Sequence, residues 1–265
     1  MVAPYRLVVA LMLLALCRDV PAEARSVEKL PFLLRTKTLT LTVYRPPAAV
    51  KGTILMGSGD LGWVGLAVKM SEFLVQQNYL VVGFNVREYL STFTAGRQHV
   101  SIDDIRADYR AMSELLARGG LLRHPVLLSG VSEGAALAVA AAGDPKNRPW
   151  IDGVVTMGLP ATAELAWRWV DMASLITRRD ADEPSFAPYG YLGTIAPIPL
   201  AMIQSATDDY STDADRAQLL DAAKPPKKMI MIGAANHRFT DKLPELRTEL
   251  LGAIAWIMTA ASSRR

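Results

Sequence analysis

The chain has 265 residues, of which 51% are hydrophobic and 21% are charged, and its formal net charge is +3. This length fits one α/β domain or two small ones, with enough apolar residues for a large core. The small net charge, carried by scattered Lys and Arg residues, excludes a dense basic surface, so we expect no nucleic-acid partner.

The N-terminal segment has the pattern of an export signal. Arg6 supplies a positive charge, residues 7–16 form an apolar run too short to span a bilayer, and Ala22-Glu23-Ala24 has the small residues of a cleavage site. We therefore predict a signal peptide over residues 1–24, with cleavage after Ala24. The mature protein is then periplasmic or secreted.

Cys17 is the only cysteine, and cleavage after Ala24 would leave the mature chain without a thiol or a disulfide. One alternative is that Cys17 is a lipoprotein acceptor, although bulky Leu16 precedes it where a small residue is expected. Another is an uncleaved membrane anchor, which Arg18, Asp19 and Pro21 argue against because they interrupt the apolar run.

From Arg35 onward, short apolar runs alternate with stretches of helical periodicity. Alternating Thr and apolar residues over 38–43 predict a half-exposed antiparallel strand, and the buried runs predict further strands at 53–56, 80–84, 126–128, 154–157, 199–203 and 229–232. Helices are expected after Trp63 and over 105–116, 135–142, 164–176, 213–223 and 246–258. This order predicts one mostly parallel central sheet with helices on both faces.

The sequence Gly130-Val131-Ser132-Glu133-Gly134 lies at a predicted strand-to-helix junction. A G-x-S-x-G motif in this context is typical of the nucleophile elbow of α/β-hydrolases, whose tight turn exposes the serine hydroxyl above the sheet. Ser132 is therefore the candidate nucleophile. The alternative is a small residue in a Gly-rich turn, which the presence of a base and an acid would exclude.

Three histidines are available as the base: His99, His124 and His237. In α/β-hydrolases the chain order is nucleophile, acid, histidine, and only His237 follows Ser132. His237 also lies in a loop between the last predicted strand and the last predicted helix. It is the candidate base.

The acid is expected in the loop after the strand at 199–203, where Asp208 and Asp209 are adjacent. Spacing from the end of the strand favours Asp208, and Asp209 remains the alternative acid. Asp213 and Asp215 lie where the first turn of the next helix is expected, a favourable place for carboxylates.

Two backbone N–H groups are expected to stabilise the oxyanion. One belongs to Glu133, the residue after the nucleophile, and the other is assigned to Asp60 in the Gly-rich turn that follows the strand at 53–56. Alternatively, this turn serves only to reverse the chain. Since both residues carry carboxylates, we hypothesise that at least one receives an ammonium group of the substrate. The other interpretation is that Glu133 packs on its helix and Asp60 caps a helix.

The irregular segment at 177–197 contains Pro, Gly and aromatic residues, and Trp167 and Trp169 precede it. This composition predicts a cap that lines the substrate pocket. Aromatic side chains packed on an ordinary surface loop are the alternative.

Part of the sequence resembles the AcvB/VirJ-type bacterial virulence proteins, which are exported α/β-hydrolases. The resemblance covers about Thr53 to Ala142 and rests on Ser58-Gly59-Asp60-x-Gly62-Trp63, on Arg87 and Tyr89, and on the elbow at Ser132. It implies a periplasmic serine hydrolase acting on an aminoacyl-phosphatidylglycerol ester, with Gly59, Trp63 and Tyr89 binding substrate. The chain differs from that family at Val131, at Glu133 and in the context of His237, Ala-Asn-His-Arg-Phe.

Together these features predict a single-domain exported α/β-hydrolase over residues 25–265 that cleaves a small-molecule or lipid ester, with a membrane surface as a candidate partner. The alternatives are a general carboxylesterase, a peptidase, or a non-catalytic hydrolase-fold binding protein. The sequence has no metal-ligand spacing of His or Cys, and we expect neither a metal nor another cofactor. The oligomeric state is left open.

Overall fold

The computed structural model describes residues 26–34, 37–92, 99–166 and 184–263. The predicted signal peptide, Cys17, Trp167 and Trp169 lie outside the described residues, and so does most of the helix expected at 164–176. Of the expected cap at 177–197, residues 184–197 are described.

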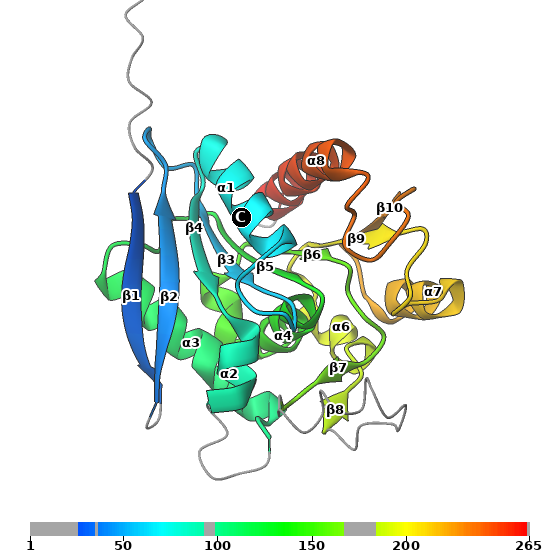
Figure 1. The fold of residues 1–265 in the computed structure, drawn as a ribbon, viewed down its shortest axis with the longest axis horizontal. Helices are drawn as coiled ribbons and strands as arrows, with labels where there is room; N and C mark the ends of the chain where they lie inside the picture. Colours follow the sequence, from blue (N-terminus) through cyan, green and yellow to red (C-terminus); the bar gives the residue numbers. More distant parts are fainter. Residues whose placement is uncertain (1–25, 35–36, 93–98, 167–183, 264–265) are drawn as a thin grey trace, which may run out of the picture.

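The described residues form a central sheet of eight strands in the order β1-β2-β4-β3-β5-β6-β9-β10 (Figure 1). The pairs β1–β2 and β2–β4 are antiparallel, and all other neighbours are parallel. The predicted mostly parallel sheet is therefore confirmed. The strands are β1 (Ser26–Leu34), β2 (Lys37–Arg45), β3 (Thr53–Gly57), β4 (Leu80–Phe84), β5 (Val126–Val131), β6 (Gly153–Met157), β9 (Leu200–Ser205) and β10 (Lys227–Ile232).

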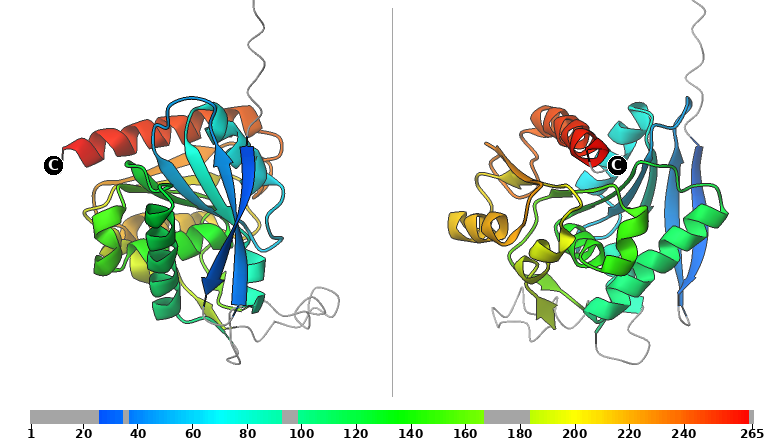
Figure 2. Two further views of the ribbon diagram at one scale, coloured as in Figure 1. Left: turned by 90° about the vertical axis from the view of Figure 1, so that its left-hand side faces the viewer. Right: turned by 180° about the vertical axis from the view of Figure 1, so that it is seen from behind.

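Helices cover both faces of this sheet (Figure 2). One face packs against α1 (Leu66–Gln76) and α8 (Leu243–Ser262), and the other against α2 (Val86–Thr92), α3 (Ile102–Arg118), α4 (Glu133–Ala142) and α6 (Tyr189–Ile195). Alternation along β3 divides the core: Ile54 and Met56 pack with α1 and α8, and Leu55 packs on the opposite side.

Smaller elements complete the described chain. Helix α7 (Asp213–Ala222) lies beside β10, the 3-10 helix η1 (Pro145–Trp150) follows α4, and β7 (Ala163–Glu164) pairs with β8 (Ser185–Phe186). None of the described helices is both long and apolar enough to cross a membrane.

The sequence did not predict β1, α2, η1, β7, β8 or α6. Strand β1 is mostly exposed and contains Glu28, Lys29 and Pro31, so its apolar alternation is confined to its C-terminal half, where Phe32 and Leu34 are buried. Pairing along the whole of β2 holds it at the sheet edge. Helix α2 has only seven residues, too few for a helical period to be recognised. At the start of the helix expected over 164–176, the structure instead has the short strand β7.

Helix α4 begins directly after Ser132 and is almost completely buried. Every residue from Gly134 to Ala142 is buried, and most are alanines. Small side chains allow the helix to pack closely against the central strands. The sheet and α4 together therefore fix the position of the turn that joins β5 to α4.

Candidate active site

Ser132 lies between β5 and α4 in a backbone conformation that non-glycine residues rarely adopt, with φ 52° and ψ −119°. The glycines of the motif allow the close packing around this turn. A Cβ at Gly130 would lie 2.1 Å from the Gly134 carbonyl carbon, and one at Gly134 would lie 2.4 Å from the Ser58 carbonyl oxygen. The strand, strained turn and helix therefore have the geometry expected of a nucleophile elbow.

His237 and Asp208 form a close pair near this turn. Nδ1 of His237 lies 2.7 Å from Oδ2 of Asp208, and the side chains are 9% and 1% exposed. An ionised carboxylate can only accept, so Nδ1–H is the donor. Asp208 also accepts the Tyr210 N–H at 2.8 Å, whereas Asp209 is exposed to solvent. Of the two adjacent carboxylates, the structure brings Asp208 to the histidine.

The imidazole of His237 is fixed on two further sides. The Tyr210 ring packs edge-on at a centroid distance of 4.9 Å and an angle of 62°. Gly158, at φ +62°, leaves room for the ring, since a Cβ there would lie 2.8 Å from Cε1 of His237. The other ring nitrogen, Nε2, is buried and has no hydrogen-bond partner among the described residues. It therefore keeps a lone pair able to accept a proton.

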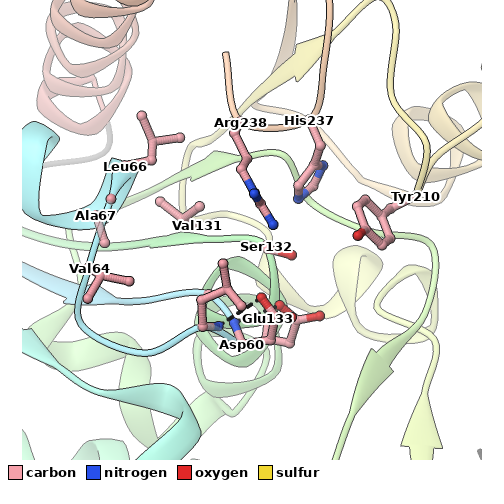
Figure 3. A pocket seen from close by; sticks show the side chains of 13 residues that line it. Asp60, Val64, Leu66, Ala67, Val131, Ser132, Glu133, Tyr210, His237 and Arg238 are labelled. Carbon is pink, nitrogen blue, oxygen red and sulfur yellow. Dashed lines mark hydrogen bonds between the residues drawn. The ribbon is translucent and has the colours of Figure 1, made fainter. Parts of the chain in front are cut away.

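The turn after β3 brings the Asp60 N–H to the elbow. This N–H donates to Oε2 of Glu133 at 3.2 Å (Figure 3). The Asp60 carboxylate accepts only the N–H of Leu61 among the described residues, at 2.9 Å. Helix α1 begins later, with Gly65 at its N-cap, so the alternative in which Asp60 caps this helix is wrong.

The Glu133 carboxylate lies among these groups rather than packing on its helix. Burial, followed by the charge of Asp60, raises the pKa of Glu133. The hydrogen bond from the Asp60 N–H and the nearby Ser132 hydroxyl and Glu133 N–H act in the opposite direction but only partly compensate. Two carboxylates thus share the region in front of the serine.

These groups line one pocket of about 100 Å³. Its apolar rim includes the exposed side chains of Leu61, Val64 and Tyr210. Arg238 also lines it, and its guanidinium makes no hydrogen bond or ion pair with any residue that the structure describes. The remaining lining residues are Gly59, Asp60, Gly65, Leu66, Ala67, Val131, Ser132, Glu133 and His237.

Of the three substrate-binding residues implied by the family resemblance, only Gly59 lines the pocket. Trp63 donates its indole N–H to the Tyr44 hydroxyl at 3.0 Å and covers Gly83. Tyr89 is fully buried and donates its hydroxyl to Asp108 at 2.6 Å. Trp63 and Tyr89 therefore support the fold around the site and are not placed to bind substrate.

The described part of the expected cap, residues 184–197, does not line this pocket. Phe186 packs edge-on against Tyr191, and Leu192 and Ile195 belong to the core on the α4 side of the sheet. These aromatic and apolar side chains therefore match the alternative of ordinary packing. Residues 177–183 are outside the described part of the chain.

Sequence reasoning missed three residues around His237. Tyr210 and Arg238 immediately follow Asp209 and His237, so neighbours of the predicted acid and base would have been a usable signal. Gly158 follows β6, and only the structure shows that the ring of His237 fills the space beside it.

Within the described ranges, no group of three or more His, Cys, Asp or Glu side chains is arranged to hold a metal ion. The site described here consists of a serine, a histidine, an aspartate and backbone donors.

Comparisons with known proteins identify the fold. No family model and no curated protein matches the chain. Among solved structures, the esterase domain of a Rhodothermus marinus protein is 22% identical and has a TM-score of 0.60, over 87% of this chain and 98% of that one. An α/β serine hydrolase without a lid from Xanthomonas campestris is 16% identical, with a TM-score of 0.59, over 87% and 94% of the two chains.

A third neighbour is a dienelactone hydrolase from Anabaena variabilis, 16% identical with a TM-score of 0.58, over 90% of this chain and 96% of that one. The likeness spans nearly the whole described chain in each case. The chain therefore has the α/β-hydrolase fold, as the sequence predicted.

Proposed function

We propose that this protein is an exported serine hydrolase that cleaves a carboxylic ester through an acyl-enzyme. The observation that carries the proposal is that Ser132, on a strained strand-to-helix turn, and His237, which is paired with buried Asp208, line the same pocket. The α/β-hydrolase fold hosts many activities, so the argument rests on these residues rather than on the fold.

In the proposed mechanism, Oγ of Ser132 attacks the ester carbonyl carbon while Nε2 of His237 takes its proton. Asp208 holds the ring in the tautomer with Nδ1 protonated and stabilises the imidazolium. The N–H groups of Asp60 and Glu133 stabilise the oxyanion. His237 then gives the proton to the departing alcohol, and the acyl group remains on Ser132.

Deacylation repeats these steps with water as the nucleophile. His237 takes a proton from water, hydroxide attacks the acyl carbonyl, and the proton returns to Ser132 when the carboxylic acid leaves. Every step uses side chains, backbone donors and water.

We further propose an aminoacyl-phospholipid, such as an aminoacyl-phosphatidylglycerol ester, as the substrate. Three features support this choice: exposed apolar side chains on the rim, the guanidinium of Arg238, which pairs with no described residue, and the Asp60 and Glu133 carboxylates. They match, in order, acyl chains or a membrane surface, a lipid phosphate and an ammonium group. The resemblance to AcvB/VirJ-type proteins points to the same substrate class.

A non-catalytic binding protein is the second candidate, and one observation favours it. Nε2 of His237 has no partner among the described residues, so the hydrogen bond between histidine and serine is not formed. A general carboxylesterase or a peptidase would use the same catalytic groups and differs only in substrate.

The first test is labelling of the mature protein, from Arg25, by an uncharged fluorophosphonate. We expect labelling of the wild type and none of Ser132→Ala or His237→Ala. If the folded wild type stays unlabelled, the binding-protein alternative replaces the hydrolase. Mass spectrometry of the exported protein tests cleavage, with Arg25 as the expected first residue.

The substrate is tested with vesicles containing aminoacyl-phosphatidylglycerol and with neutral p-nitrophenyl esters. Arg238→Ala is expected to raise KM for the lipid about tenfold and to leave the neutral ester unchanged. The control, Arg118→Ala on the surface of α3, should change neither. Asp60→Asn is expected to reduce the preference for cationic over neutral acyl esters, and an unchanged preference would exclude the aminoacyl group.

A further inference from the structure

The Glu133 carboxylate lies at the donors that the reaction needs for its oxyanion. Oε2 accepts the Asp60 N–H at 3.2 Å, and the backbone N–H of Glu133 is near enough to lower the pKa of the same carboxylate. These are the two backbone donors that the proposed mechanism assigns to the oxyanion. An anionic side chain is thus already hydrogen-bonded to one of them and lies beside the other.

The same carboxylate also lies close to the nucleophile. The Ser132 hydroxyl is near enough to lower the pKa of Glu133, while Nε2 of His237 has no partner among the described residues. The hydroxyl is therefore not hydrogen-bonded to the base. In this state, the Asp60 donor is occupied by the carboxylate and the serine is not engaged by His237.

We propose that Glu133 is an intramolecular competitor for the oxyanion hole, which the substrate carbonyl must displace before Ser132 can react. The inference rests on the proposed function and deepens it by naming a residue that sets the reaction rate. The backbone donor at position 133 is independent of the side chain, so a substitution there removes the competitor and keeps the hole.

Charge makes this competition depend on pH. The groups that share the pocket with Glu133 are the Asp60 carboxylate, the Ser132 hydroxyl, His237, the Arg238 guanidinium and the Tyr210 hydroxyl. As pH falls through the raised pKa of Glu133, its carboxylate gains a proton and becomes a weaker acceptor. The competitor is therefore strongest above that pKa and weakest below it.

The test measures the second-order rate constant for labelling by an uncharged fluorophosphonate, as a function of pH. Above the pKa of Glu133, we expect Glu133→Ala to be labelled about tenfold faster than the wild type, and Glu133→Gln to be intermediate. The ratio of variant to wild type should approach one at low pH.

Asp60→Asn is the matched control, because it removes the same charge from the pocket and leaves the competitor in place. Its labelling is expected to rise less than that of Glu133→Ala. Since Asp60 raises the pKa of Glu133, the pH at which its rate changes should move downward. An equal rise in both variants would mean that charge alone is responsible, and would overturn the inference.

The remaining outcomes separate the inference from the proposed function. If the wild type and Glu133→Ala are labelled at equal rates at every pH, the competitor is excluded and the serine hydrolase stands. If both are folded by circular dichroism and neither is labelled, the proposed function fails and the inference fails with it. If Glu133→Ala does not fold, the labelling rate of Glu133→Gln, which preserves the size of the side chain, is compared with that of the wild type instead.

Discussion

Two His–Asp pairs lie at opposite ends of the parallel strands in the described part of the chain. His237 and Asp208 follow β10 and β9, with 2.7 Å between Nδ1 and Oδ2. His124 and Asp152 precede β5 and β6, with 2.5 Å between the same two atoms. The side chain of His237 is 9% exposed and that of His124 is 48% exposed.

The surroundings of the second pair explain why it is not a catalytic site. Asp152 also accepts the Val126 N–H at 2.7 Å, so it anchors the start of β5. The nearby Ser262 ends α8 with ordinary helical geometry, and its hydroxyl donates to the Met258 carbonyl at 2.9 Å. A His–Asp pair alone therefore indicates little. A catalytic pair must also lie at the carboxyl ends of the parallel strands, beside a serine on a strained turn.

The largest expected effect separates the two histidines. His237→Ala is expected to lower kcat for a p-nitrophenyl ester by about 10⁴-fold or more, because the proton acceptor for Ser132 is lost. His124→Ala should keep kcat within about twofold, since no group of its pair enters the reaction. A similar loss in both variants would show that the comparison is mistaken.

The second-largest effect on kcat is expected from the two adjacent carboxylates, Asp208 and Asp209. Asp208→Asn is expected to lower kcat by about 10³- to 10⁴-fold, because an amide does not hold His237 with Nδ1 protonated. Asp209→Asn, which changes an exposed neighbour, should leave kcat within about twofold. Steady-state kinetics of the two purified variants would decide, and a reversed order would transfer the role to Asp209.

A smaller effect is expected from crowding the catalytic ring. The added Cβ of Gly158→Ala would lie 2.8 Å from Cε1 of His237, so the ring must move, and we expect kcat to fall by about 10²-fold. Gly252→Ala in α8 is the control, because a Cβ there meets nothing within 4 Å. Unchanged kcat in Gly158→Ala would mean that the ring position tolerates this shift.

The smallest effect is expected at the His124–Asp152 pair, and it changes stability rather than kcat. Asp152→Asn weakens the bonds to His124 and to the Val126 N–H, and is expected to lower the free energy of unfolding by about 1 kcal/mol. Its kcat should equal that of the wild type. Urea denaturation measures the first quantity, and a loss of kcat in the folded variant would contradict a purely structural role.

Much of the fold could be predicted because buried strands and helices carry periodic apolar patterns. The strand before Ser132, the helix after it and the positions of His237 and Asp208 all follow from this order. Strand β1 could not be predicted, since backbone pairing with β2 holds a segment whose own side chains are mostly exposed.

The details of the site depend on side-chain directions that no spacing encodes. Tyr89 follows β4 at a position that the family resemblance associates with substrate, yet its hydroxyl turns inward to Asp108. Glu133 was expected to contribute its backbone N–H, and its carboxylate lies on the same donors. Both outcomes are set by contacts between segments distant in the sequence.

The burial of α4 predicts the order in which parts of the active site open when the protein is heated. Because residues Gly134 to Ala142 are buried throughout, their amides should exchange with deuterium only through global unfolding. The turns that carry Asp60 and His237 include exposed residues, among them Asp60, Leu61 and Arg238, so we expect these turns to open locally before α4 does. Heating should then abolish turnover before the sheet melts.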